Sequence, residues 1–242
     1  MQKQRLDQAL VARGLVATRS QAESWIRLGK ATVNGHVVTK PGEAVREDSI
    51  VQLTATEQYV SRAGLKLASV AAALQLNFTD KVMLDVGSST GGFTDYALQH
   101  GARKVIAVEV GTNQLHPSLH NNPNIELHEQ TDIRDMHELS HAPDIVVIDV
   151  SFISLRDILP HIATLCTPKT RIVAMVKPQF EAAVSSLKHK GVIKNDRMRR
   201  DILKSFEAWT SKFFVITAKA DSDIAGAKGN LERFYVLAPH KR

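Results

Sequence analysis

The chain has 242 residues, of which 43% are hydrophobic, so it can form one large domain or a medium and a small one, and it is too apolar for a disordered protein. Its formal net charge of +6 at pH 7 favours a polyanionic partner, and its single cysteine, Cys166, excludes an intrachain disulfide. No apolar run approaches the roughly 18–20 residues of a membrane span, and the start has no signal-peptide pattern, so the sequence predicts a cytoplasmic protein without a membrane span. Clustered cysteine and histidine ligands of the zinc-ribbon kind are missing from the sequence, so no metal site is predicted.

The first elements in chain order are two short helices. Apolar residues recur at helical spacing over residues 6–12, and Gly14 ends this helix. Thr18 or Ser20 caps a second helix, which Gly29 closes.

A small sheet follows these helices. The stretch "ATVNGHVV" alternates around Asn34-Gly35, a pair that tolerates the positive φ of a type I′ hairpin turn, and "SIVQL" predicts another short strand. Two helices and a sheet within residues 1–56 make a feasible small α+β domain, which we call the N-terminal module.

Positive charge is concentrated in two parts of the sequence. Cations outnumber anions within the first 40 residues, and they do so again between residues 188 and 204. The second run consists of Lys188, Lys190, Lys194, Arg197, Arg199, Arg200 and Lys204, opposed by Asp196 and Asp201. Phosphate groups of a nucleic acid are the natural partners of such runs.

The N-terminal module resembles the small RNA-binding domain first known from ribosomal protein S-four. The matching residues are Arg5-Leu6-Asp7, Leu10, Gly14, Ser20, Ala22, Ile26, Gly29, Val33-Asn34-Gly35 and Lys40-Pro41. The resemblance implies that the module binds RNA. The residues predicted to lie on exposed helix positions and to contact phosphates are Arg5, Arg13, Arg19, Arg27 and Lys30.

A polar segment over residues 54–60 separates this module from a longer α/β region. We expect an RNA-binding domain over 1–56, a linker over 57–61 and a second domain over 62–242. Predicted strands cover 82–86, 104–110, 145–150, 171–176, 213–218 and 233–238, and predicted helices cover 91–100, 154–166 and 196–211. Buried strands that alternate with helices predict a Rossmann-like α/β fold, with a mainly parallel sheet and helices on both faces.

The stretch "DVGSSTGGF", residues 85–93, predicts a ligand loop directly after the first strand of this sheet. A triphosphate loop would have lysine where Phe93 stands, and a dinucleotide loop would have different glycine spacing. The pattern instead resembles the first motif of S-adenosylmethionine-dependent methyltransferases, with Ser89 in place of a frequent middle glycine. The candidate cofactor-binding residues of this loop are Asp85, Gly87, Ser88, Ser89, Thr90, Gly91, Gly92 and Phe93.

Individual roles follow for several residues in this cofactor set. Glycines 87, 91 and 92 would let the backbone approach the amino-acid part of the cofactor, and Asp85 would attract its ammonium group. Glu109 ends the second strand at the distance expected of an acid that binds ribose hydroxyls. Asp132, after a third strand, would accept a hydrogen bond from the adenine amino group, and Asp149 completes the set.

The residues after the fourth strand narrow the choice of methyl acceptor. Methylation of an exocyclic amine commonly uses [DN]-P-P-[YF], whereas this chain has Asp149-Val150-Ser151-Phe152. Methylation at carbon 5 of a base needs a cysteine nucleophile, but Cys166 lies in a predicted helix without a nearby base and is interpreted as buried filler.

A ribose 2′-hydroxyl is a very weak acid, so its methylation needs a base, and a lysine held by carboxylates can serve. The ends of predicted elements carry two lysines and two acids that suit this task. They are Lys66, Asp149, Lys177 and Glu232. Pro178 ends strand pairing beside Lys177, which places that side chain at the ligand crevice.

Five ordered motifs, "YVSRAGLKL", "DVGSSTGGFTD", "DVSFISL", "VKPQFE" and "GAKGNLE", resemble the TlyA family, often labelled hemolysin A-like. The catalytic domain of that family resembles FtsJ-like ribose methyltransferases, so residues 62–242 are expected to form an FtsJ-like domain. The resemblance implies methyl transfer from S-adenosylmethionine to a ribose 2′-hydroxyl, of a cytidine, in the RNA of ribosomal subunits. It also implies that Lys177 is the base, that Asp149 orients it, and that Lys66 and Glu232 position the ribose.

This sequence departs from the family pattern at three places. Arg62-Ala63-Gly64 replaces a Gly-Gly pair, Ser222-Asp223 replaces Ser-Pro, and Arg233 replaces an apolar residue. Two other functions stay open on the sequence: a membrane-active hemolysin-like protein, and an RNA-binding protein with an inactive methyltransferase fold. The target nucleotide, the ribosomal subunit and the oligomeric state are not determined by the sequence.

Overall fold

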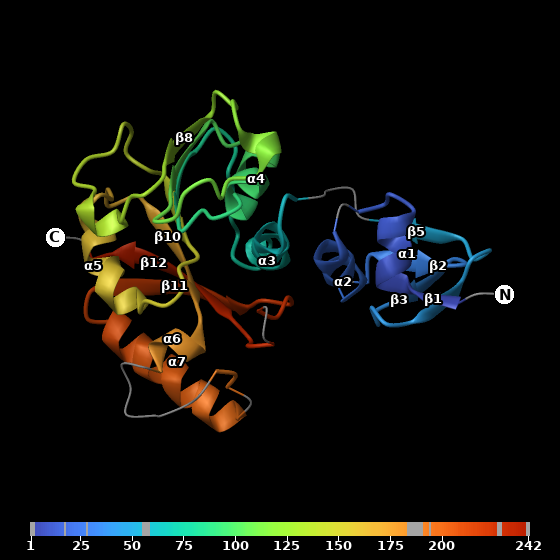
Figure 1. The fold of residues 1–242 in the computed structure, drawn as a ribbon. Helices are drawn as coiled ribbons and strands as arrows, with labels where there is room; N and C mark the ends of the chain where they lie inside the picture. The colour runs from blue at the N-terminus through green and yellow to red at the C-terminus, as the bar shows by residue number, and fades with distance from the viewer. Residues whose placement is uncertain are drawn as a thin grey trace.

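The structure is a computed structural model of the protein. It describes residues 3–16, 18–27, 29–54, 59–182, 191–193, 195–226 and 229–240. The predicted cations Lys188, Lys190 and Lys194 lie outside these residues. Figure 1 shows the N-terminal module, in blue, beside a larger α/β domain.

The N-terminal module forms two helices and two small sheets. Its elements are β1 (Lys3–Arg5), α1 (Leu6–Ala12), α2 (Arg19–Arg27), β2 (Ala31–Val33), β3 (His36–Val38), β4 (Ala44–Arg46) and β5 (Val51–Leu53). The predicted glycine and turn positions are confirmed, because Gly14 and Gly29 both have φ 68° and Asn34-Gly35 has positive φ at both residues. The Thr18 hydroxyl accepts a hydrogen bond from Gln21 N (3.2 Å), which is the predicted helix cap.

The N-terminal module contains a pair of strands that the sequence did not predict. Strand β2 pairs with both β3 and β5, as expected from the hairpin, but β1 and β4 form a second antiparallel pair. Both of these strands are three residues long and largely exposed, so they lack the apolar alternation by which a strand is recognised.

The larger domain is built around a seven-stranded sheet in the order β11-β12-β10-β9-β6-β7-β8. Its strands are β6 (Val82–Val86), β7 (Lys104–Val108), β8 (Ile125–His128), β9 (Ile145–Ile148), β10 (Arg171–Val176), β11 (Phe214–Asp221) and β12 (Arg233–Pro239). Its helices are α3 (Arg62–Ala71), α4 (Gly92–Gln99), η1 (Pro117–Leu119), η2 (Ile133–Asp135), α5 (Leu155–Thr164), α6 (Pro178–Glu181) and α7 (Asp196–Thr210). Strand β12 is antiparallel to both neighbours, and the pairs among β10, β9, β6, β7 and β8 are parallel.

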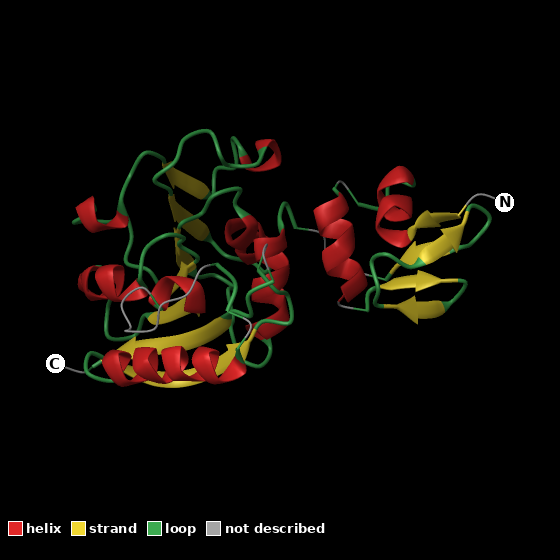
Figure 2. Cartoon of the chain, turned by 60° about the horizontal axis from the view of Figure 1, so that its bottom comes forward, coloured by secondary structure: helices red, strands yellow, loops and turns green. Residues whose placement is uncertain are grey.

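Helices cover both faces of this sheet, as Figure 2 shows. Alternate residues of the buried strands pack with α3 and α4 on one face, and with α5 and α7 on the other. The first cluster continues into α1 and α2 of the N-terminal module, so the two parts share apolar packing. The predicted fold class, a mainly parallel Rossmann-like sheet with helices on both faces, is confirmed.

Several predicted element ends are wrong by one or two residues. Strand β7 ends at Val108 rather than at residue 110, and β9 ends at Ile148 rather than at residue 150. Helix α5 ends at Thr164, so Cys166 lies beyond the helix and is half-buried. Burial raises the pKa of the Cys166 thiol to about 12, which disfavours a nucleophilic thiolate.

The segment that enters α3 connects the two parts of the chain. Tyr59 lies within the expected linker, but its ring is buried and lies 5.3 Å from the ring of Tyr96. The Gln21 side chain of α2 donates a hydrogen bond to the Tyr59 carbonyl (2.9 Å). Asp95 of α4 accepts a hydrogen bond from Val60 N (2.7 Å). Packing and hydrogen bonds therefore anchor this segment to both parts.

Candidate active site

Two neighbouring cavities lie at the carboxyl ends of the parallel strands, where such sheets bind ligands. The Glu109 cavity measures about 570 Å³, and its wall includes Gly87, Ser89, Glu109, Val110, Asp132, Ile133, Asp149 and Ile153. The Lys177 cavity measures about 430 Å³, and its wall includes Lys66, Phe152, Lys177, Gln179, Phe180, Asn230 and Glu232. Ser151 and Phe152 line both cavities. A molecule in one cavity can therefore reach a group in the other.

Lys177 and Asp149 form an ion pair between neighbouring strand ends. Asp149 follows β9 and Lys177 follows β10, and these strands are paired in parallel. Lys177 Nζ lies 2.5 Å from Asp149 Oδ1 and donates a hydrogen bond to Ser151 Oγ (2.8 Å). Lys177 is 9% exposed, so its amine is held in a fixed place inside the cavity wall.

Lys66 and Glu232 form a second ion pair in the wall of the same cavity. Lys66 lies on α3, and Glu232 immediately precedes β12. Lys66 Nζ lies 2.5 Å from Glu232 Oε2, and both residues are buried, with exposures of 8% and 2%. Each buried lysine thus faces a carboxylate, so the charges within each pair balance. The structure brings together the four predicted residues Lys66, Asp149, Lys177 and Glu232.

An aromatic pair, the exposed Phe152 and the half-buried Phe180, lines the Lys177 cavity. Phe152 is 92% exposed and has φ 67°, an uncommon backbone conformation for a bulky residue. Its ring lies 5.2 Å from that of Phe180. The sequence interpretation used the segment of Phe152 for its lack of prolines and missed these two rings. Backbone strain of this kind concentrates at functional sites.

The glycines of the loop have packing reasons within the protein. A Cβ at Gly87, which has φ 80°, would lie 2.8 Å from the carbonyl oxygen of Asp149. A Cβ at Gly91 would lie 2.5 Å from Leu119 Cδ1, and one at Gly92 would collide with Ser61 Oγ. Contact with the chain itself therefore gives each of the three glycines a structural role, and Gly87 also lines the Glu109 cavity, so its predicted approach to a ligand stays a prediction.

Glu109 braces the loop while it lines its cavity. Its Oε2 accepts a hydrogen bond from Ser89 N (2.9 Å), and its Oε1 accepts one from Gly111 N (2.7 Å). A carboxylate oxygen can accept more than one hydrogen bond, so Glu109 retains capacity for a ligand hydroxyl.

Asp85 lies behind the loop rather than in the cavity wall. It is 1% exposed, and its Oδ2 accepts a hydrogen bond from Thr94 Oγ1 (2.6 Å). Burial raises the pKa of the Asp85 carboxyl to about 7. The residues of the predicted cofactor set that lie outside the cavity lining are Asp85, Ser88, Thr90, Gly91, Gly92 and Phe93.

Asp132 closes another side of the Glu109 cavity and caps the short helix η2. Its Oδ1 accepts a hydrogen bond from Arg134 N (2.9 Å), and its Oδ2 pairs with the Arg134 guanidinium (2.6 Å). Hydrogen bonding to Arg134 lowers the pKa of the Asp132 carboxyl, so this acid stays ionised.

The predicted RNA-binding residues of the N-terminal module fall into two groups. Arg5 and Arg19 both contact the buried carboxylate of Asp7, each at 2.9 Å, and the Asp7 pKa falls to about 2, led by the Arg5 hydrogen bond. Arg13 donates hydrogen bonds to the carbonyls of residues 47 and 49. Residues 27 and 30 are exposed cations.

The parallel sheet, the loop after its first strand and the ion pairs at its strand ends together define a Rossmann-like methyltransferase. The FtsJ-like methyltransferase family matches residues 59–239, and an S4 domain matches residues 4–51. The chain therefore belongs to the FtsJ-like methyltransferase family and carries an N-terminal S4 domain, which confirms the predicted family.

Relatives match nearly the whole chain. YqxC of Bacillus subtilis, named as a candidate rRNA methyltransferase, is 40% identical over 95% of this chain and 84% of its own length. TlyA of Mycobacterium tuberculosis, named as a 16S/23S rRNA (cytidine-2′-O)-methyltransferase, is 35% identical over 96% of this chain and 89% of its own length. A solved structure titled as a candidate hemolysin from Streptococcus thermophilus has a TM-score of 0.71 at 36% identity, covering 99% of this chain and 89% of that one.

The description of that structure as a hemolysin raises the question whether this protein contacts a membrane. None of the helices in the described ranges is both long enough and apolar enough to cross a bilayer.

Proposed function

We propose that this protein transfers the methyl group of S-adenosylmethionine to a ribose 2′-hydroxyl, of a cytidine, in ribosomal RNA. The observation that carries the proposal is the Lys177–Asp149 pair, whose partners lie 2.5 Å apart, with Lys177 lining one cavity and Asp149 lining the next. Relatives named as rRNA methyltransferases support the choice of substrate.

The Glu109 cavity suits the cofactor. Apolar side chains of Val110, Ile133 and Ile153 offer contact to a flat ring, while Glu109 and Asp132 offer acceptors for hydroxyl and amino groups. In its ionised form, Asp85 would add negative charge behind the loop and stabilise an ammonium group there. When bound, S-adenosylmethionine supplies an electrophilic methyl group on a sulfonium.

The Lys177 cavity supplies the groups that act on the hydroxyl. In the proposed step Lys177 Nζ would first release its proton to solvent and then accept the proton of the ribose 2′-hydroxyl, while the ribose oxygen would accept the methyl group that bound S-adenosylmethionine supplies, leaving S-adenosylhomocysteine. Asp149 and Ser151 hold this amine in place through their contacts at 2.5 Å and 2.8 Å. Lys66, held by Glu232, positions the ribose from the wall of the same cavity.

Recognition of the nucleotide is assigned to two places. Phe152 and Phe180 offer a stacking surface for the base in the lining of the Lys177 cavity. The N-terminal module, residues 1–56, is proposed to hold the RNA with Arg27 and Lys30, which are exposed, and with the partly paired arginines 5, 13 and 19. The linker over 57–61 and the catalytic domain over 62–242 complete the proposed domain division, and the reaction is proposed to occur in the cytoplasm.

Labelled S-adenosylmethionine and purified ribosomal subunits test this function. We expect label in rRNA, and we expect mapping of 2′-O-methylated positions in cells with and without the gene to identify a cytidine. Cofactor binding without label in any ribosomal substrate would contradict the proposal and favour an inactive RNA-binding protein.

A further inference from the structure

We propose that the outward face of helix α7 is a second RNA-binding surface, which holds the strand beside the Lys177 cavity. The inference rests on the proposed function, because it concerns the same substrate. We define the α7 face as Arg197, Arg200, Lys204 and Lys212, the last of which follows the helix. All four residues are exposed.

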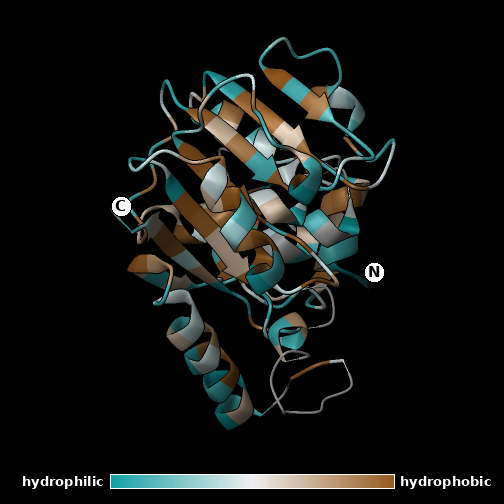
Figure 3. Cartoon of the chain, turned by 90° about the vertical axis from the view of Figure 1, so that its left-hand side faces the viewer, coloured by the Kyte–Doolittle hydropathy of each residue, from teal (hydrophilic) through white to brown (hydrophobic). Residues whose placement is uncertain are grey.

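Helical periodicity separates this face from the core. The buried residues of α7 are Ile202, Leu203, Phe206 and Thr210, and Leu203 and Phe206 belong to the core cluster that includes the sheet strands. Positions 197, 200, 204 and 208 follow the opposite side of a helix with 3.6 residues per turn. Figure 3 shows α7 projecting from the body of the domain with hydrophilic residues along it. Asp201 is the anion on this side, so the α7 face carries net positive charge.

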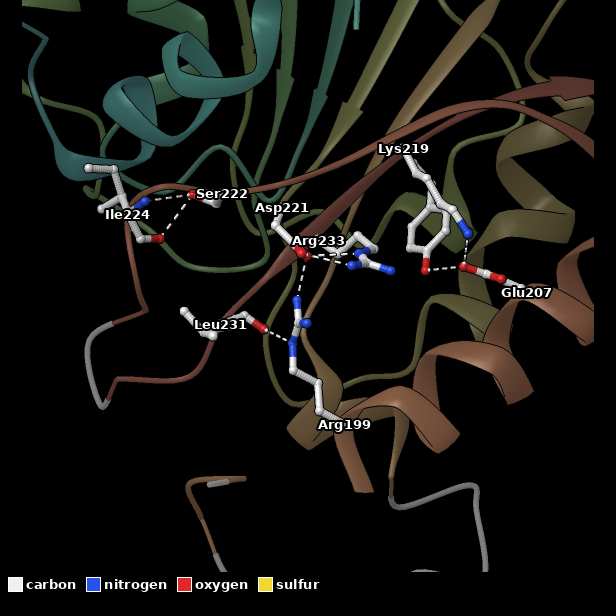
Figure 4. A network of polar contacts seen from close by, with 9 residues as sticks. Arg199, Glu207, Lys219, Asp221, Ser222, Ile224, Leu231 and Arg233 are labelled. Atoms are coloured by element: carbon white, nitrogen blue, oxygen red, sulfur yellow. Dashed lines mark hydrogen bonds and ion pairs between the residues drawn. The ribbon is translucent and has the colours of Figure 1, made fainter. Parts of the chain in front are cut away.

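The neighbouring arginine shows what a structural cation of α7 looks like. Arg199 turns inward, where it pairs with Asp221 and donates a hydrogen bond to the carbonyl of Leu231 (3.2 Å), as Figure 4 shows. Asp221 also binds Arg233 (2.7 Å), which accounts for the arginine that replaces an apolar residue of the family. Within the described residues, Arg197, Arg200 and Lys204 form no such ion pair.

Helix stability does not explain the first of these cations, Arg197. The side chain of Asn195 caps α7, which begins at Asp196, so Arg197 lies in the first turn of the helix. The partial positive charge of a helix N-terminus disfavours cations there, at a cost of about 0.3–1 kcal/mol. The placement of Arg197 is therefore better suited to binding an anion than to stabilising its own helix.

The α7 face also begins beside the candidate active site. Ile193, two residues before the cap, donates a hydrogen bond from its backbone to Asn230 Oδ1 (2.9 Å), and Asn230 lines the Lys177 cavity. Helix α6, which carries the cavity residues Gln179 and Phe180, packs against α7. The fifteen residues of α7 extend about 22 Å from this point. A strand whose ribose enters the cavity can continue along this face.

The RNA contacts expected of the N-terminal module strengthen the need for another surface. Arg5 and Arg19 share the carboxylate of Asp7, and Arg13 is bound to backbone carbonyls. The cations of the α7 face form no ion pair with the described residues, so they are the freer donors to phosphate.

A matched pair of double variants tests the inference. Arg197→Gln/Lys204→Gln removes two charges from the α7 face. The control, Arg103→Gln/Lys169→Gln, removes two exposed charges at the amino ends of β7 and β10, whereas the cavities lie at the carboxyl ends. Affinity for unmodified ribosomal subunits is measured at several salt concentrations, with thermal unfolding as the folding control.

We expect the α7 variant to bind about tenfold more weakly near physiological salt and to lose about 1.4 from the slope of log K against log salt, at about 0.7 per phosphate contact. Its KM for RNA should rise while its kcat stays unchanged, and the control variant should match the wild type. Equal affinity and slope for the two variants would overturn the proposal. So would a loss of binding to phosphatidylglycerol vesicles with RNA affinity intact, which would assign the face to a membrane.

The binding comparison does not depend on catalysis. If wild-type protein binds subunits but transfers no methyl group, the proposed function fails while the two variants still decide the role of the α7 face. If methyl transfer is normal in all three proteins and their affinities agree, the α7 proposal alone fails.

Discussion

Replacing Lys177 with methionine removes one amine and keeps most of the volume of the side chain. The structure gives this amine two contacts, to Asp149 Oδ1 at 2.5 Å and to Ser151 Oγ at 2.8 Å. Both partners remain in the variant, so the cavity loses its candidate proton acceptor while its wall keeps its shape.

The expected loss follows from the role assigned to this amine. A positioned general base contributes about 10²- to 10⁴-fold to a rate, which equals about 3–5 kcal/mol of transition-state free energy. Asp149 also loses its cation, and a buried carboxylate without its partner costs up to about 3–5 kcal/mol of stability. The side chain of Asp149 is 16% exposed, so water can offset part of that cost. We therefore expect kcat to fall at least 100-fold in a protein that is still folded.

Single-turnover transfer of labelled methyl at saturating cofactor measures this loss. Calorimetry should give a cofactor dissociation constant close to that of the wild type, since Lys177 lies outside the lining of the Glu109 cavity. Lys169→Met is the matched control, because this exposed lysine precedes the amino end of the same strand. A Lys177→Met rate within threefold of the wild type would refute the assignment of this lysine as the base.

Three further predictions concern other parts of the structure. Phe152→Ala should raise KM for RNA by about 5- to 150-fold, the value of one stacked base, and an unaltered KM in steady-state kinetics would contradict this role. Burial raises the Asp85 pKa to about 7, so the folded state keeps a proton that the unfolded chain loses near pH 4. The free energy of unfolding of the wild type should therefore fall as pH rises from about 4 to about 7. Urea unfolding of Asp85→Asn should show a weaker dependence on pH over this range. Because the Asp7 pKa is lowered to about 2, its stabilisation is present above pH 4 and lost as pH falls through 2. Asp7→Asn should therefore cost about 1–2 kcal/mol at neutral pH, reduced by the exposure of its arginine partners, and the difference should close in acid.

Local chemistry determined those features that the sequence alone could predict. Gly14 and Gly29 end helices because a left-handed residue suits glycine, and Asn34-Gly35 turns a hairpin for the same reason. The buried strands could be predicted from the sequence because apolar β-branched residues follow one another over five or six positions. Lys177 was readable as a site residue because a charge after such a strand, followed by proline, has to lie at the sheet edge.

Tertiary packing decided what no local pattern contains. Lys66 and Glu232 meet only because α3 and the start of β12 are folded against the same cavity. A side chain at position 92 would collide with Ser61, because helix α4 packs closely against the segment around that residue. Ser61 is distant from Gly92 in the sequence, so no local pattern predicts this contact.

Exposure is the other property that only the fold assigns. Asp85 is hidden behind its loop and Phe152 is almost fully exposed, although their residue types suggest the reverse. A sequence determines which groups a chain carries and which local conformations they favour. Which groups face each other, and which face water, depends on contacts between distant segments, and those contacts are settled by the packing of the whole chain.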